Sequence, residues 1–262
     1  MDTDEGNAWT PGWHEVLAPA EWAALRASPV YRGIDVPPGD GSAVVLVRGF
    51  LTRGVYLRPL HGWLARIGYR PRFADVGWNA DCWQVSTDRV VAEVAAASAE
   101  TGRPVHLVGH SLGGILSRAA AAHAPEGVAS VATLGTPFRG LRLNPALRAT
   151  AWVMRASIHH RRPTVPPGCA TLTCACDAVQ SQTRPLPAGL PQLAIAGRHD
   201  GVTDWRYCLD PERIPSHTVA ASHFGITLNA RTYELLAAHL ATRAGERTQP
   251  SRISSGSSAE TT

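Results

Sequence analysis

Residues 105–114 constrain the fold of this chain more than any other stretch. They read VHLVGHSLGG and pass from a short apolar run into an alanine-rich one. Residues 105–108 predict a strand, and residues 112–123 have the length of a helix. Ser111 lies where the strand turns sharply into the helix, and glycines flank it two residues away on either side, where side chains would collide. The pattern predicts a nucleophilic serine that stands above the end of a strand; the alternative is a strand that the Gly-Gly pair merely ends.

Predicted strands and helices alternate along most of the chain. Continuous apolar runs such as residues 43–47 are typical of buried parallel strands. Alternation of this kind predicts an α/β fold with a doubly wound, mostly parallel sheet. The predicted strands are 43–47, 72–76, 105–108, 128–134, 192–196 and 217–221, and the main predicted helices are 55–67, 87–101, 112–123 and 228–240.

Four separated motifs resemble those of the α/β-hydrolase superfamily, and more narrowly its bacterial lipase and esterase branch. They are LVRGF at 46–50, GHSLGG at 109–114, GTPFRG at 135–140, and the late pair Asp200 and His223. Together they span most of the chain. The resemblance implies the α/β-hydrolase fold with a helical lid or cap insertion.

The resemblance also implies a Ser-His-Asp triad. Ser111 is then the nucleophile, Asp200 the acid in a Gly-x-x-Asp-Gly-Val pattern after strand 192–196, and His223 the base after the last strand. Ser, Asp, His is the chain order of this superfamily. Asp204, which looks like the cap of a short helix, is the alternative acid, and His199 is the competing base and is expected to be exposed.

By the same resemblance, the backbone N–H groups of Phe50 and Leu112 are the oxyanion-hole donors. Arg48 stands where relatives more often carry histidine or proline, and an ordinary turn is the alternative interpretation of Gly49. His110 and His106 are expected to be structural, because one adjoins the nucleophile at a sharp turn and the other lies inside a strand.

The domain organisation is predicted to have three parts. Residues 1–40 form an extension that packs on the domain, with an interaction module as the alternative. Residues 41–244 form the catalytic domain. Its insert at 141–190 opens with Asn144-Pro145, an N-cap and N1 pair, and the helix that follows is either an apolar lid or plain core packing. Residues 245–262 are too polar to pack and are expected to be a disordered tail.

Composition narrows the partners and the compartment. All 25 basic residues are arginine, scattered along the chain, and the formal charge of +4 is modest; this excludes a nucleic-acid-binding surface. Neither a secretory signal nor a membrane-spanning run is evident, so a cytoplasmic protein is expected.

The chain has five cysteines, an odd number, and four of them fall in its C-terminal half. Cys174 and Cys176 lack the spacing of a zinc site. Reduced thiols are expected. The alternative is one structural disulfide from Cys174 or Cys176 to Cys208, since the resemblance places both segments at the same sheet edge.

The expected activity is hydrolysis of acyl esters or lipids through an acyl-enzyme, with no metal or organic cofactor. An acyltransferase or thioesterase would use the same triad. A catalytically inactive hydrolase fold that serves as a binding protein is the alternative of a different class. The lid would allow transient contact with a lipid surface, and the sequence gives no indication of the oligomeric state.

Overall fold

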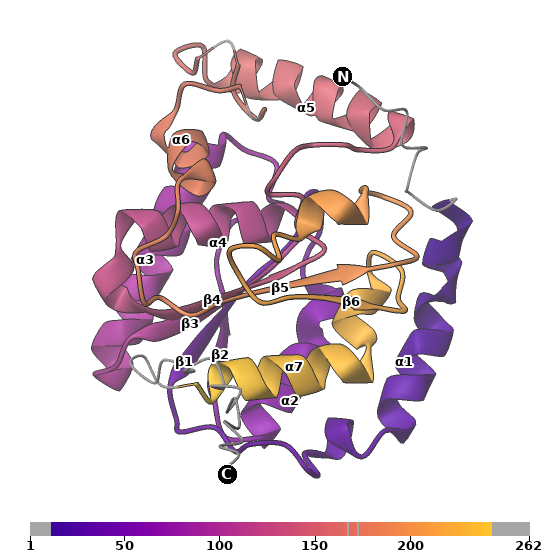
Figure 1. The fold of residues 1–262 in the computed structure, drawn as a ribbon. Helices are drawn as coiled ribbons and strands as arrows, with labels where there is room; N and C mark the ends of the chain where they lie inside the picture. The colour runs from indigo at the N-terminus through magenta and orange to yellow at the C-terminus, as the bar shows by residue number, and fades with distance from the viewer. Residues whose placement is uncertain (1–11, 167, 172, 243–262) are drawn as a thin grey trace, which may run out of the picture.

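The computed structural model describes residues 12–166, 168–171 and 173–242, and these residues form a six-stranded parallel sheet between two layers of helices (Figure 1). The spatial order of the strands is β2-β1-β3-β4-β5-β6, and every pair is parallel. The prediction of a doubly wound parallel sheet is therefore confirmed. The strands are β1 (Ala43–Val47), β2 (Arg70–Phe73), β3 (Val105–His110), β4 (Val128–Leu134), β5 (Gln192–Gly197) and β6 (Ser216–Val219).

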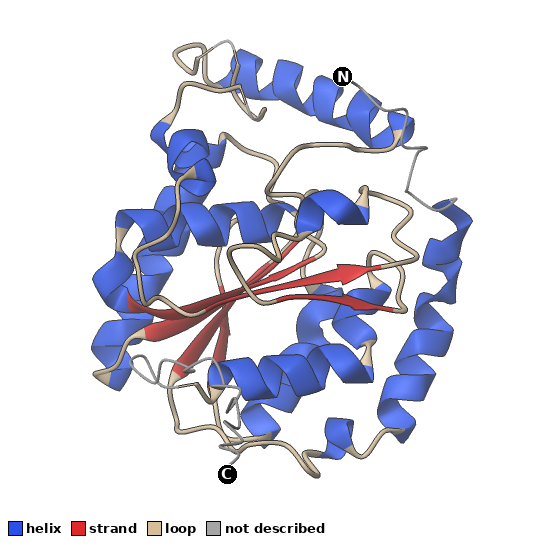
Figure 2. Ribbon diagram, in the orientation of Figure 1, coloured by secondary structure: helices blue, strands red, loops and turns tan. Residues whose placement is uncertain are grey.

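Helices cover both faces of the sheet (Figure 2). One face carries α3 (Trp83–Thr101), α4 (Leu112–His123) and α6 (Asp177–Thr183), and the other carries α1 (Ala18–Ala27), α2 (Arg58–Arg66) and α7 (Ala230–Leu240). The position of strand β1 between the two helical layers explains why its sequence is apolar throughout. Its side chains alternate between the two cores, with Val45 in the first and Val44 in the second, and both are fully buried.

Short 3-10 helices connect these elements. They are η1 (Gly12–Leu17), η2 (Val30–Arg32), η3 (Val55–Leu57), η4 (Pro125–Gly127), η5 (Trp205–Cys208) and η6 (Gly225–Leu228). The expected helix 55–67 divides into η3 and α2, and the expected helix 228–240 begins later, at Ala230. Asn229 sets that start, because its side chain accepts hydrogen bonds from the N–H groups of Arg231 and Thr232.

Strand β2 begins two residues before the predicted strand 72–76 and contains Pro71. It lies at the edge of the sheet and pairs only with β1. Proline is accommodated at an edge because its missing N–H faces away from any partner strand.

The segment 141–190 divides into two structurally different parts. Helix α5 (Pro145–Arg161) lies outside the helical layer, above the sheet in Figure 1. Helix α6 instead packs on α3 and α4, and buries Ala178 and Val179 in their core. Of the two helices in this segment, only α5 therefore lies outside the helical layers.

The N-terminal segment packs on the α2–α7 side of the molecule. Leu25 of α1 is buried in the core with Trp63 and Tyr233, and Trp22 packs against that core. The first eleven residues of the expected extension, and the expected tail at 245–262, lie outside the described residues. None of the helices built from the described residues combines the length and the apolar character needed to cross a bilayer.

The disulfide alternative is wrong, because all five cysteines are free thiols. Cys174 and Cys176 pack with Cys82 and Cys169 in the core beside α3 and α4. Cys208 lies on η5, where its sulfur contacts the Thr203 hydroxyl at 3.7 Å. The segment with Cys174 and Cys176 thus packs beside α3 and α4, whereas Cys208 lies on η5, and the disulfide between them does not form.

Candidate active site

Ser111 forms the tight turn between β3 and α4. Its backbone has φ +55° and ψ −125°, a conformation that costs a non-glycine residue on the order of 1–3 kcal/mol. The turn is held by hydrogen bonds from the Ser111 N–H to the Leu134 carbonyl at 2.9 Å and from the Gly114 N–H to the Ser111 carbonyl at 3.0 Å. Backbone strain at a half-buried serine that directly follows a central strand is typical of a nucleophile elbow.

Three glycines allow this turn. A Cβ at position 109 would lie 2.4 Å from the Gly114 Cα, and one at position 113 would lie 2.1 Å from the Val47 carbonyl oxygen. A Cβ at position 114 would lie 2.0 Å from the Thr136 hydroxyl oxygen. Each of these distances is far inside van der Waals contact, so the GHSLGG motif reflects backbone packing around Ser111 as much as chemistry.

Asp200 and His223 form a buried pair at the carboxyl ends of the strands, where Ser111 also lies. Asp200 follows β5 and His223 follows β6, and the Asp200 Oδ2 lies 2.6 Å from the His223 Nδ1. The carboxylate also accepts hydrogen bonds from the N–H groups of Val202 and Thr203 at 2.8 and 2.7 Å, and from the Thr203 hydroxyl at 3.0 Å. Because an ionised carboxylate can only accept, the bond to Asp200 fixes Nδ1 as the protonated nitrogen of neutral His223 and leaves Nε2 without a proton.

The pKa values of this pair shift in opposite directions. Burial, the largest effect on both, opposes the charged forms, but the attraction between Asp200 and His223 outweighs it. The pKa of Asp200 is consequently lowered, with help from its backbone donors, and the pKa of His223 is raised, with a further contribution from Glu15. The geometry therefore favours an ionised carboxylate that stabilises a protonated imidazole.

The competing residues have other contacts. Asp204 is fully buried, caps η5 and pairs with Arg206 at 2.9 Å. His199 is exposed and packs edge-on against His14. The His106 ring contacts the Ser130 hydroxyl at 2.8 Å inside the sheet. Each contact is structural.

Ser111 and its expected oxyanion donors open into one cavity. Phe50, Leu112 and Ser111 all line it, together with Thr203, whose hydroxyl bonds Asp200. Within the described part of the chain, the Ser111 hydroxyl makes no hydrogen bond to the His223 ring. Bonds of this kind are often long in unliganded enzymes and tighten when substrate binds.

The loop after β1 is held by Arg48 and Asn79. The Arg48 guanidinium donates to the carbonyls of Gly77 and Ala74 at 3.1 and 3.2 Å, and the Asn79 side-chain amide donates to the Arg48 carbonyl at 2.6 Å. Arg48 therefore ties the Phe50 loop to the segment after β2. This contact gives a structural reason for the arginine that stands at this position.

A hydrogen-bond chain that the sequence did not reveal joins this loop to the histidine loop. The Gly49 N–H donates to the Tyr56 hydroxyl at 2.9 Å, the Tyr56 hydroxyl lies 2.9 Å from the His110 Nδ1, and the His110 Nε2 lies 2.9 Å from the His223 carbonyl. A carbonyl can only accept, so Nε2 carries the proton and Tyr56 donates to Nδ1. Burial lowers the pKa of His110 to about 3, which keeps this ring neutral. His110 is thus a structural link between the two loops.

Two glutamates of the N-terminal segment hold the loops of the acid and the base. The Glu15 carboxylate accepts hydrogen bonds from the N–H groups of Gly201 at 3.2 Å, His223 at 2.9 Å and Phe224 at 3.1 Å. Glu21 accepts from both the N–H and the hydroxyl of Ser222 at 2.9 Å. No motif marks either residue in the sequence, because all but one of these partners are backbone N–H groups, and every partner lies about 200 positions away.

The cavity beside Ser111 lies under α5. Its volume is about 80 Å³ and its walls are almost entirely apolar. Helix α5 contributes Leu147, Ala151, Met154 and Ile158, which recur at three- or four-residue spacing on one face, while Trp152 and Val153 on the other side are exposed. The Asn144 side chain caps the N-terminal end of α5. A bidentate ion pair of Arg162 with Asp81, at 2.8 and 2.9 Å, holds the other end.

Among the described residues, no group of His, Cys, Asp or Glu side chains has an arrangement that could hold a metal ion.

The sheet order, the serine elbow after β3 and the buried acid and histidine after β5 and β6 define the α/β-hydrolase fold, as the sequence motifs predicted. A family model described as the alpha/beta hydrolase fold matches residues 84–175, which include Ser111.

The chain is similar to curated triacylglycerol lipases. It is 34% identical to one from Burkholderia plantarii over 133 residues, which cover 47% of this chain and 37% of the relative. It is 52% identical to another, from Pseudarthrobacter phenanthrenivorans, over 54 residues, which cover 20% of this chain and 17% of the relative. The matched stretches thus span well under half of either relative.

Solved structures of lipases share the fold over a larger part of the chain. The mature form of the Bacillus licheniformis lipase BlEst2 has a TM-score of 0.57 at 18% identity, with 79% of this chain and 95% of that chain covered. Aspergillus fumigatus lipase B has a TM-score of 0.56 at 15% identity, with 84% and 57% covered. At these identities the likeness shows the fold.

Proposed function

We propose that this protein is a serine carboxylic ester hydrolase that uses Ser111 as nucleophile, His223 as general base and Asp200 as the acid of the triad. One observation carries the proposal. A buried, hydrogen-bonded Asp200–His223 pair lies at the same sheet edge as a serine in a strained elbow. The similarity to triacylglycerol lipases supports an ester as the substrate.

In the proposed reaction, His223 Nε2 takes the proton of Ser111 as the hydroxyl oxygen attacks the ester carbonyl carbon. Asp200 holds the ring by Nδ1 and stabilises the imidazolium that forms. The same histidine returns the proton to the leaving alcohol. Water then attacks the acyl-enzyme while His223 takes one of its protons, and His223 returns that proton to the Ser111 oxygen as the carboxylic acid leaves.

The oxyanion of the tetrahedral intermediate is proposed to accept from the N–H groups of Phe50 and Leu112. The Leu112 N–H belongs to the first turn of α4, where the helix leaves N–H groups unpaired and the helix dipole favours negative charge. Loss of one such donor typically costs about 3 kcal/mol of transition-state stabilisation. The bonds of Arg48 and Tyr56 support this role by fixing the backbone around Phe50.

The acyl chain is proposed to enter the apolar cavity under α5. Ligand sites usually enclose about 300–1,000 Å³, whereas this cavity has a volume of only about 80 Å³. Helix α5 must therefore move for an acyl chain to bind, which makes it a lid. The cytoplasmic location and the domain limits expected from the sequence remain predictions.

The test is hydrolysis of a p-nitrophenyl ester series from acetate to palmitate, with Ser111→Ala as the control, beside labelling with a fluorophosphonate. We expect turnover with an optimum at one chain length, and loss of both turnover and labelling in Ser111→Ala. Full activity in Ser111→Ala would overturn the proposal, as would a wild-type protein that neither hydrolyses the esters nor reacts with the fluorophosphonate. Labelling without turnover would retain the nucleophile and overturn the choice of substrate.

A further inference from the structure

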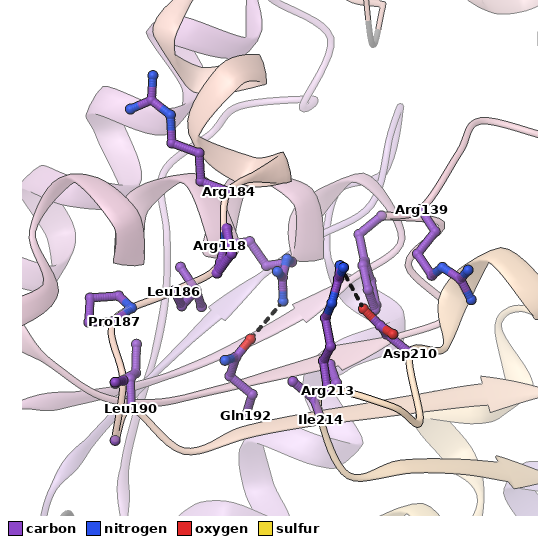
Figure 3. A pocket seen from close by; sticks show the side chains of 14 residues that line it. Arg118, Arg139, Arg184, Leu186, Pro187, Leu190, Gln192, Asp210, Arg213 and Ile214 are labelled. Atoms are coloured by element: carbon purple, nitrogen blue, oxygen red, sulfur yellow. Dashed lines mark hydrogen bonds and ion pairs between the residues drawn. The ribbon is translucent and has the colours of Figure 1, made fainter.

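A second and larger cavity lies away from Ser111, with a volume of about 720 Å³ (Figure 3). Four segments surround it: the middle of α4, residues 138–139 after β4, residues 184–192 leading into β5, and residues 210–214 before β6. It shares no lining residue with the cavity beside Ser111. The mechanism proposed above makes no use of it.

The lining of this cavity is strongly cationic. It contains four arginines, at positions 118, 139, 184 and 213, against the single carboxylate of Asp210. Asp210 pairs with Arg213 at 3.7 Å, and the Arg213 side chain is 76% exposed, so it is able to turn toward a ligand. The formal charge of +3 that remains on the lining favours an anion.

Arg118 distinguishes this cavity from an ordinary arginine-rich surface. It is only 8% exposed, its guanidinium donates to the Gln192 side-chain oxygen at 2.9 Å, and its Cζ lies 4.6 Å from the centre of the Phe138 ring. Burial lowers its pKa, and Asp210 is the charge that opposes this effect. A buried, oriented guanidinium of this kind suits an oxyanion, because its planar donors match carboxylate and phosphate oxygens.

The walls between the arginines are apolar. Phe138, Leu186, Leu190 and Ile214 contribute side chains, and Pro185 and Pro187 stiffen the segment that leads to β5. The volume lies within the range of small-molecule sites. An inorganic ion alone would leave these walls exposed to water, whereas an organic anion would cover them.

We propose that this cavity binds a small organic oxyanion, with a phosphate or carboxylate group held by Arg118 and Arg213 and a compact apolar body against Phe138, Leu186 and Ile214. The site is separate from the proposed ester hydrolysis, because the two cavities share no lining residue. Residues 137–138 lie between the two cavities, since Pro137 lines one and Phe138 lines the other.

The test measures thermal unfolding of the full chain at constant ionic strength with phenyl phosphate, phenylacetate, inorganic phosphate and the uncharged benzyl alcohol. We expect the two organic anions to raise Tm by about 3–5 °C at about ten times their Kd. Inorganic phosphate should act more weakly, and benzyl alcohol should have no effect. The ratio of the Kd values of phenyl phosphate and phenylacetate shows whether the site prefers a phosphate or a carboxylate group.

Variants locate the binding. Arg118→Gln should weaken binding of the better anion by about tenfold or more, and the double change Arg184→Gln and Arg213→Gln tests the same cavity at exposed positions that folding does not require. Arg231→Gln on α7, also exposed, is the matched control and should bind as the wild type does. A wild type without a saturable shift would overturn the proposal, as would cavity variants that keep wild-type affinity or an Arg231→Gln variant that loses as much affinity as they do.

Discussion

The Glu15 carboxylate accepts the backbone N–H of His223 at 2.9 Å, and so an N-terminal residue holds the loop that carries the proposed base. The same carboxylate also binds the N–H of Gly201, next to Asp200, at 3.2 Å. One side chain therefore sets the spacing between the acid loop and the base loop. This arrangement makes the N-terminal segment part of the site's framework.

We predict that Glu15→Ala lowers kcat by about 10- to 100-fold while the sheet stays folded, because misplacing reacting groups by about 1 Å has an effect of this size. The negative charge of Glu15 also raises the pKa of His223, so its removal should shift the acid limb of the kcat/KM profile to lower pH. Glu234→Gln, on an exposed turn of α7, is the control. An unchanged pH profile together with unchanged kcat would contradict the positioning role.

The strain at Ser111 predicts a difference between two inactive variants. Ser111→Gly removes the cost of a positive φ, about 1–3 kcal/mol, against a backbone-entropy cost of about 0.5–1 kcal/mol. Ser111→Ala keeps the strain. Urea unfolding should therefore give Ser111→Gly the higher free energy of unfolding, by about 1 kcal/mol. Equal values would mean that the elbow is not strained.

Asp200 and Asp204 are both fully buried, and their substitutions should separate catalysis from stability. Asp200→Asn should lower kcat by about 10⁴-fold, because an amide no longer holds His223 in the required tautomer. Asp204→Asn should keep most of the activity but lower the free energy of unfolding, since it weakens the cap of η5 and the pair with Arg206. Ester hydrolysis and urea unfolding, measured on both variants, test this assignment. The reverse pattern would make Asp204 the acid.

Tyr56→Phe should disturb the loop that carries the proposed oxyanion donor Phe50, although Tyr56 does not line the cavity beside Ser111. It leaves the Gly49 N–H and the buried His110 Nδ1 without partners, at a cost of about 1–3 kcal/mol in the free energy of unfolding. We expect kcat to fall with KM nearly unchanged, because the neighbouring Phe50 N–H is proposed to donate to charge that develops only in the transition state. A rise in KM alone would place Tyr56 in substrate binding instead.

Arg162→Met should release one end of α5. The Arg162–Asp81 pair is partly exposed, so its loss should change the free energy of unfolding only slightly. Hydrogen exchange in α5 should nevertheless become faster, because this pair closes the helix over the cavity. Arg148→Met, at an exposed position of the same helix, is the control. Unchanged exchange in both variants would mean that apolar contacts alone hold α5 in place.

The sequence was most informative where a pattern is local. Strands β1 and β4 have the predicted bounds, because continuous apolar runs between turns define them. The turn at Ser111 could be predicted because its neighbouring glycines are required by contacts close to it. Asp200 and His223 could be selected only through the resemblance, and the geometry favours both.

The features that the sequence did not reveal depend on contacts between distant segments. Glu15 acts on backbone N–H groups, which every residue but proline carries, and so its partners leave no mark in the sequence. Tyr56 resembles any other core aromatic until His110 is placed beside it. The position of α6 in the helical layer also depends on packing against α4. The sequence of a short polar helix does not predict such packing.

The bonds of Glu15 also have a consequence for the timing of synthesis. Its partners Gly201 and His223 follow it by 186 and 208 residues. During translation the glutamate is made before its partners, and its acceptor role begins only after β5 and β6 have been made and paired. Contacts of such long range form late, because loop closure must precede them. The nascent chain therefore contains the elbow serine before the proposed base, His223, has been made, and the proposed site is complete only after the last strand has paired.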